Sequence, residues 1–84
     1  MDKRSNHANE YTRLGLNIAY YRKLKGLTQM RLSEMTGISR THMSNIEARN
    51  VPTSISMDTL FDIAEALEIP AYKLLIFKDE INVN

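Results

Sequence analysis

Leu27 to Asn50 reads LTQMRLSEMTGISRTHMSNIEARN, and this stretch decides the fold. Thr28 and Ser39 each carry a hydroxyl that can cap the start of a helix, and the apolar residue before each cap can pack onto the helix that follows. Gly37 stands where the first of these helices must end in the left-handed conformation that glycine adopts without strain. Because Gly37 and Ile38 alone are left for the bend, the sequence predicts two short helices joined by a tight turn.

Apolar residues in this stretch recur at helical spacing, which predicts one shared inner surface. They are Leu32, Met35, Ile38, Met43 and Ile46. The outer side of the second helix is left with a polar stripe that contains no acidic residue, made by Arg40, Thr41, Ser44, Asn45 and Ala48. Such a stripe can enter the major groove of duplex DNA.

The stretch resembles the helix-turn-helix of the phage-repressor and Cro-like regulators, also called the xenobiotic-response-element family. The resemblance continues over LGLNIAYYRKLKGLTQ at 14–29 and SISMDTLFDIAEALEI at 54–69, and so covers about two thirds of the chain. Within the family, RTHMS at 40–44 followed by Ile46 and Glu47 is similar to the controller proteins of restriction-modification systems. The resemblance implies an all-α, compact five-helix bundle with a helix-turn-helix, a lambda-repressor-like DNA-binding domain.

Length and composition limit the possible functions. A chain of 84 residues makes one small domain with a modest core, so compact helices or a partner subunit should help to hold it. Because cysteine is absent, disulfides and thiolate metal sites are excluded, and a reducing compartment is expected. No apolar run reaches membrane-spanning length, and the N-terminus lacks the apolar core of a signal peptide. We therefore expect a cytoplasmic protein without a membrane partner.

The charge is divided unevenly along the chain. Residues 1–50 hold nine Lys/Arg against four Asp/Glu, a net +5, and residues 51–84 hold two against six, a net −4, which together give the total of +1. The basic half carries the helix that can enter a groove, as a duplex-binding surface requires. Short chains also vary in charge by chance, so the asymmetry alone decides nothing.

The chain is expected to divide into three parts. Residues 1–8 form a flexible N-terminal arm, in which Lys3 and Arg4 can either reach around DNA or simply fray. Residues 9–78 form the helix-turn-helix domain with C-terminal dimerisation helices, and residues 79–84 form a C-terminal tail. The first helix is expected from Asn9 to Lys25, with an inward stripe of Tyr11, Leu14, Ile18, Tyr21 and Leu24.

The expected DNA contacts fall into two groups. Arginine can fork onto guanine, asparagine onto adenine, and the methyl of threonine can meet that of thymine. This chemistry predicts base reading by Arg40, Thr41, Ser44 and Asn45, although Arg40 can instead clamp a phosphate. Contacts with the DNA backbone are expected from Gln29, Ser39, His42, Arg49 and Asn50. The resemblance implies that Gln29 contacts a phosphate, and the alternative is a glutamine that contacts only solvent. His42 can equally be an ordinary surface histidine.

Arg22 and Glu47 are expected to form a structural ion pair. Glu47 falls on the protein side of the groove-entering helix, where an unpaired carboxylate is costly to bury. The resemblance implies Arg22 as its partner, because family members often pair these two positions. The family also usually has a glycine two residues after this glutamate, and we expect Asn50 to supply the left-handed helix end in its place.

The C-terminal third should complete the core and provide a dimer interface. Ser56 can cap a fourth helix, and Pro70 can start a last, short one. That last helix carries too many apolar side chains for one buried face. One face should pack within the monomer, and the other predicts a two-fold dimer interface. Its candidate residues are Tyr72, Leu75, Ile76 and Phe77, with Ile81 and Val83 as extensions. The alternative is a wholly intramolecular core.

These expectations combine into one function. The chain should be a homodimeric transcriptional regulator that binds double-stranded DNA sequence-specifically, with residues 39–48 in the major groove of a two-fold symmetric operator. No catalytic constellation, cofactor motif or paired metal ligands are found, so we expect neither an enzyme nor a cofactor. No small-molecule ligand is expected either. The alternative class is a protein-interaction module, such as an antitoxin that mainly binds a partner protein.

Overall fold

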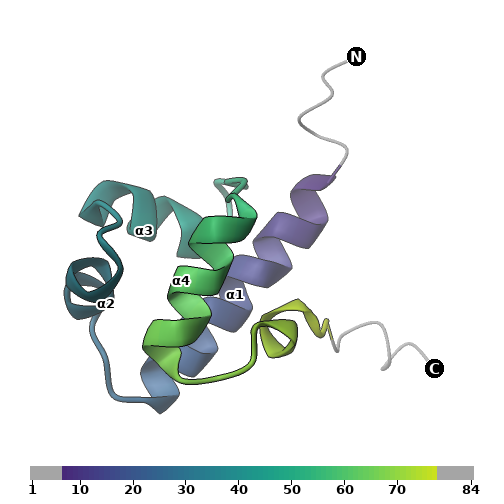
Figure 1. The fold of residues 1–84 in the computed structure, drawn as a ribbon. Helices are drawn as coiled ribbons and strands as arrows, with labels where there is room; N and C mark the ends of the chain where they lie inside the picture. Colours follow the sequence, from purple (N-terminus) through teal and green to yellow (C-terminus); the bar gives the residue numbers. More distant parts are fainter. Residues whose placement is uncertain (1–6, 78–84) are drawn as a thin grey trace.

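The computed structural model describes residues 7–77, in which four α-helices and one short 3₁₀ helix are connected without a β-strand (Figure 1). Lys3 and Arg4 of the expected arm, and Ile81 and Val83 of the expected tail, lie outside the described residues. The elements are α1 (Ala8–Leu24), α2 (Gln29–Thr36), α3 (Arg40–Glu47), α4 (Met57–Leu67) and η2 (Ala71–Leu75).

The all-α fold predicted from the sequence is confirmed, with one difference in the helix count. The fifth element is a 3₁₀ helix of five residues, in which the Lys73 amide donates to the Pro70 carbonyl at 3.1 Å. This is the i to i+3 pattern of a tight helix. The bundle therefore has four α-helices, and η2 packs against α1 and α4 at the lower right of Figure 1.

Local side chains set where three of the helices begin. Thr28 Oγ1 accepts a hydrogen bond from the Arg31 amide at 2.9 Å, and Ser39 Oγ accepts one from the His42 amide at 3.0 Å. Ser56 Oγ caps α4 in the same way. Gly37 ends α2 with φ 77°, in the left-handed region. The capping and turn signals read from the sequence are thus confirmed.

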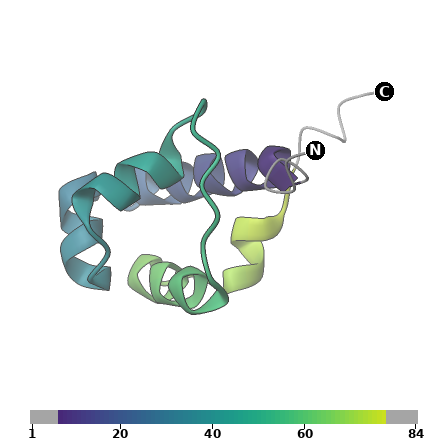
Figure 2. The same ribbon diagram turned by 90° about the horizontal axis from the view of Figure 1, so that it is seen from above.

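Every helix contributes to one core. α1 packs against α3, α4 and η2, and α2 packs against α3 and α4. In Figure 2 α3 lies alongside α1, while the connection between α3 and α4 stands out from the body. The largest fully buried side chains come from all five elements and are Ile18, Leu32, Met43, Ile63, Leu67 and Leu74.

Two residues expected in the core are exposed instead. Leu24 is 66% exposed and Met35 is 43% exposed. Along α1 the inward side follows Leu14, Ile18 and Arg22, and Leu24 lies two residues, or about 200°, beyond Arg22. In α2 the buried residues are Leu32 and Ser33, so Met35 falls at the edge of the inward face.

The end of α3 also differs from the prediction. Asn50 does not provide a left-handed helix end, because the helix finishes at Ala48 with extended backbone angles, φ −76° and ψ 134°. The hydroxyl of Thr53 donates to the Asn45 carbonyl at 3.2 Å, which satisfies one of the last acceptors of the helix. Among residues 7–77, Glu68 is the one non-glycine residue with a positive φ, 59°.

Candidate nucleic-acid interface

α3 lies directly against the backbone of α1. A Cβ atom added to Gly15 would lie 1.9 Å from the carbonyl oxygen of Ile46, so the two helices meet where α1 has no side chain. Met43 and Ile46 enter the core on the inner side of α3. The position of α3 is therefore set by contact with backbone as well as by side-chain packing.

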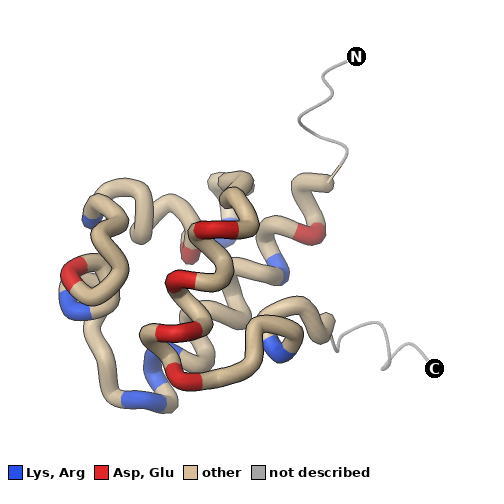
Figure 3. Tube along the Cα trace, viewed as in Figure 1, with Lys and Arg blue, Asp and Glu red and all other residues tan. Residues whose placement is uncertain are grey.

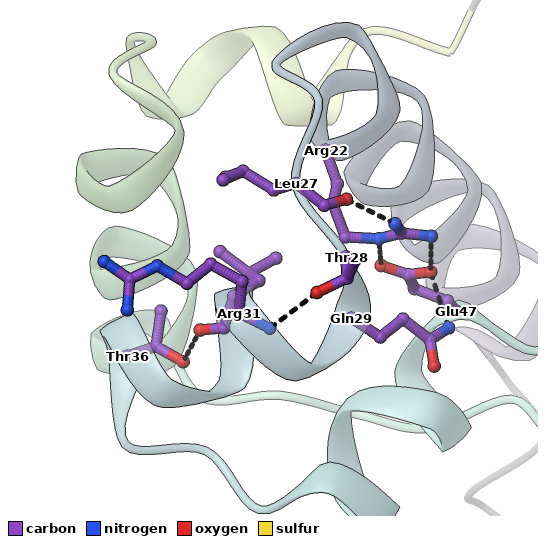
Figure 4. A network of polar contacts seen from close by, with 8 residues as sticks. Arg22, Leu27, Thr28, Gln29, Arg31, Thr36 and Glu47 are labelled. Carbon is purple, nitrogen blue, oxygen red and sulfur yellow. Dashed lines mark hydrogen bonds and ion pairs between the residues drawn. The ribbon is translucent and has the colours of Figure 1, made fainter.

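A charged network joins α3 to both α1 and α2 (Figure 4). Arg22 donates from Nε to Glu47 Oε2 at 2.8 Å and from Nη2 to Glu47 Oε1 at 2.9 Å. The third contact of the guanidinium runs from Nη1 to the Leu27 carbonyl at 2.7 Å. Because these side chains are only 10% and 5% exposed, the paired charges lie in a largely dry environment.

Gln29 belongs to the same network. Its Nε2 donates to Glu47 Oε1 at 2.9 Å, so the Glu47 carboxylate receives hydrogen bonds from α1 and from the first residue of α2. The structure thus brings together Arg22 and Glu47, as expected, and adds a contact of Gln29 with the protein. One amide hydrogen of Gln29 is used in this way, and its second one remains available to a ligand.

The outer side of α3 forms a shallow polar hollow of about 600 Å³ with the start of α2. It is lined by the four expected base-reading residues and by two of the five expected DNA-backbone contacts, namely Arg40, Thr41, Ser44, Asn45, Gln29 and Ser39. No acidic side chain lines it. Hydrogen-bond donors and one positive charge therefore converge on a single open surface.

The other three expected backbone contacts lie apart from this hollow. His42 is half-buried on α3, and Asn50 is exposed in the connection that follows. Arg49 lines a different groove, together with Arg13 and Tyr20 of α1. A role for these three residues at a duplex remains a prediction.

The acidic residues of the described C-terminal half lie along α4 and its end (Figure 3). Asp58, Asp62 and Glu65 are exposed on α4, and Glu68 follows at its C-terminus. Glu68 accepts a hydrogen bond of 2.5 Å from Lys25 Nζ, which, with the positive charge of Lys25, lowers the pKa of that carboxyl. The negative charge thus gathers on a helix that does not contribute to the polar hollow.

The candidate dimer residues are only partly available. Tyr72, Leu75 and Ile76 are exposed, whereas Phe77 is half-buried against the core. The chain here is held by Asn17, a residue that the sequence reading missed: its Nδ2 donates to the carbonyls of Leu74 at 2.8 Å and Ile76 at 2.9 Å. An asparagine inside a helix is a weak helix former, and this was the one signal for such a role.

Two other kinds of site were sought among the described residues. They contain no group of three or more His, Cys, Asp or Glu that can hold a metal ion. Within the same residues, no helix has the length and apolar character needed to span a bilayer. The polar hollow at α2 and α3 brings together six of the residues expected to contact DNA.

The fold and this site define a helix-turn-helix domain. The sequence profile of the helix-turn-helix family matches residues 18–74, and the chain belongs to that family. The family expected from the sequence is thereby confirmed.

Several characterised proteins are similar to this chain. The HTH-type transcriptional regulator SinR of Bacillus licheniformis is 36% identical over 67 residues, which cover 80% of this chain and 60% of SinR. The control protein C.SmaI of Serratia marcescens is 32% identical over 62 residues, covering 74% of this chain and 71% of C.SmaI. This chain thus spans about 60% of the length of the SinR relatives that it matches.

Solved structures show the same arrangement of helices. SinR in its complex with SinI is 34% identical and superposes with a TM-score of 0.72, covering 81% of this chain and 65% of that one. The restriction-modification controller protein C.AhdI of Aeromonas hydrophila has the same TM-score of 0.72 at 24% identity, covering 79% of this chain and 97% of C.AhdI. At that identity the second likeness concerns the fold alone.

Proposed function

We propose that this chain is a sequence-specific DNA-binding regulator of transcription that acts as a homodimer in the cytoplasm. Its residues 39–48 would enter the major groove of a two-fold symmetric operator. The observation that carries the proposal is the acid-free polar hollow, in which Arg40, Thr41, Ser44 and Asn45 share one open surface with the start of α2. Family membership and the regulators among the relatives support it.

The chemistry of the hollow suits a duplex. Arginine and asparagine offer paired contacts to guanine and adenine edges, while small hydroxyl side chains permit close approach to the groove floor. The free amides at the start of α2 and the second amide hydrogen of Gln29 can meet a phosphate. The network of Arg22 and Glu47 would hold the base-reading helix at a fixed angle, so that a phosphate contact at α2 sets the register of α3.

Selection of bound sequences from a random duplex library tests base reading, at about 0.15 M salt, where non-specific attraction is already weakened. We expect an enriched inverted repeat, and we expect Arg40→Ala to relax preference at one symmetric position. Arg31→Ala is the matched control: Arg31 is exposed on α2, pairs with Glu34 and lies outside the hollow, so its loss should leave the selected sequence unchanged. No enrichment by the folded protein would refute the proposal and favour a protein-interaction module.

Sedimentation tests the dimer separately. The expected mass at micromolar concentration is twice that of the 9.7 kDa chain. Leu75→Lys should shift the mass towards the monomer, because it places a charge on the exposed apolar side of η2. Val51→Lys changes a similarly exposed apolar residue in the α3–α4 connection and should leave the mass unchanged. A monomer for the unaltered chain would refute the dimer.

A further inference from the structure

The helix α1 makes its contacts with α3 and with η2 on opposite sides. Gly15 lies against the Ile46 carbonyl of α3. Arg22 follows almost two full turns later on the same side of α1, and it binds Glu47 at the end of α3. Asn17 lies two residues after Gly15, about 200° around the helix, and its side chain bonds to the end of η2. α1 therefore links η2 to α3.

Asn17 uses its side-chain amide to hold the main chain at the end of η2. Its Nδ2 donates to the Leu74 carbonyl at 2.8 Å and to the Ile76 carbonyl at 2.9 Å. An amide nitrogen has two hydrogens, so these two bonds occupy both. The last carbonyls of a helix have no partner inside it, and a side chain of another element can take their place. The contact is thus between α1 and the backbone of η2.

The two bonds enclose the exposed apolar residues of this segment. The Leu74 carbonyl belongs to the peptide group before Leu75, and the Ile76 carbonyl belongs to the peptide group after Ile76. Leu75 and Ile76 are 47% and 44% exposed, whereas Leu74 is fully buried. Burial is not directional, but hydrogen bonds orient the groups that they join. The direction in which Leu75 and Ile76 face therefore depends on Asn17.

We propose that Asn17 is a positioning residue of the homodimer, and that it sets the distance between the two half-sites that the dimer reads. The inference rests on the proposed function, in which Leu75 and Ile76 meet a second copy and α3 enters the major groove. In such a dimer, each α3 is connected to the shared interface through α1, Asn17 and η2. A loosened η2 lets the two α3 helices shift, while the side chains that touch bases stay the same.

Selection from inverted repeats with spacers of different length tests this role. One added base pair moves the half-sites about 3.4 Å apart and turns them by roughly 34°. We expect the unaltered chain to select one spacing. Asn17→Ala and Asn17→Asp should select the same half-site sequence over several spacings. The ratio of affinities for the best spacing and for one base pair more should fall about tenfold, as the loss of two ordinary hydrogen bonds allows.

Two controls separate this role from a general loss of stability. Asn9→Ala makes the same change at an exposed position in the first turn of α1 and should keep the single spacing. Urea denaturation shows whether each variant is folded. Asn17→Asp faces two carbonyls with a carboxylate and can unfold, whereas Asn17→Ala raises helix propensity and keeps the test valid.

The outcomes distinguish this inference from the proposed function. If the unaltered chain and the folded Asn17 variants select the same single spacing, the inference alone is overturned. If the unaltered chain selects no inverted repeat, the proposed function is refuted and the inference with it.

Discussion

The α-carbon of Gly15 faces the carbonyl oxygen of Ile46 so closely that a Cβ atom between them would lie 1.9 Å from that oxygen. Gly15→Ala must therefore push α3 away from α1. Alanine is favoured over glycine in a helix by about 1 kcal/mol, but overpacking against backbone costs more. We expect a net loss of about 2 kcal/mol or more in the free energy of unfolding, measured by urea denaturation.

Gly26→Ala is the control for this change. Gly26 has φ +75° and nothing within 4 Å of an added Cβ, so its replacement strains the backbone without a collision. That strain should cost roughly 1–2 kcal/mol. Equal stability of the Gly15→Ala variant and the unaltered chain would contradict the contact between α1 and α3.

The ion pair of Arg22 and Glu47 leads to a test by double substitution. Arg22→Met leaves the Glu47 carboxylate buried with only Gln29 as a hydrogen-bond donor, and we expect a loss of about 3–5 kcal/mol. Arg22→Met combined with Glu47→Leu removes both charges and should recover most of that loss. Urea denaturation of the two single variants and the double variant gives the coupling energy, and additive effects would rule out the pair as a stabilising unit.

Ser33 carries a buried hydroxyl that has no hydrogen-bond partner among residues 7–77. Ser33→Ala removes this uncompensated group and raises helix propensity, so we expect stability to rise by about 1 kcal/mol. Ser44→Ala makes the same change at an exposed position of α3 and should show only the smaller gain from propensity. Thermal unfolding of both variants provides the comparison, and a loss of stability in Ser33→Ala would show that the hydroxyl does have a partner.

The contact of Glu68 with Lys25 should make stability depend on pH. The hydrogen bond from Lys25, with its positive charge, holds the pKa of Glu68 below its ordinary value of 4.5. The stabilisation is then complete above pH 4.5 and is lost as the pH falls through the lowered pKa of the folded state. The stability difference between the unaltered chain and Glu68→Gln should accordingly shrink on acidification.

Salt provides a second check on this pair. The contact is exposed, so added salt at neutral pH should also reduce the stability difference between the unaltered chain and Glu68→Gln. Glu65→Gln is the control on α4, because Glu65 forms no ion pair with the residues that the structure describes. A pH-independent difference for Glu68→Gln would argue against the contact in solution.

Gln29 and Asn45 line the same hollow but should respond differently to substitution. Gln29→Glu places a second carboxylate beside Glu47 Oε1, so we expect weaker folding and weaker binding to every duplex. Asn45→Ala should keep the stability and cost about 1–3 kcal/mol of discrimination at one base pair. Urea denaturation and binding to matched and mismatched duplexes measure the two effects. A change of sequence preference in Gln29→Glu would contradict this division of roles.

The sequence was sufficient where structure depends on near neighbours. The caps at Thr28, Ser39 and Ser56 and the left-handed Gly37 each act within a few residues, so their chemistry is visible in the sequence. The polar outer side of α3 could be predicted for the same reason, because all of its residues belong to one helix and their spacing places them on one face. The pairing of Arg22 with Glu47 required the resemblance as well, because it joins two helices.

The predictions failed where a distant residue decides the outcome. Asn50 was expected to end α3, but the hydroxyl of Thr53 takes one of its last carbonyls. The sequence analysis assigned no role to Gly15, which allows the backbone of α3 to approach. Leu24 was assigned to the core by its spacing, whereas the packing of the whole bundle leaves it exposed. Each of these facts depends on a neighbour that the local pattern does not contain.

The guanidinium of Arg22 fixes α3 from the inner side, because its hydrogen bonds go to Glu47 and to the Leu27 carbonyl. The four residues proposed to read bases are thus separate from this support, whereas Gln29 belongs to the network and to the hollow. Mutations at Arg40, Thr41, Ser44 and Asn45 can accumulate during evolution with little penalty in folding. Under the proposed role of these four side chains, a lineage with this domain can acquire a new preferred ligand by small steps, each of which leaves a folded protein.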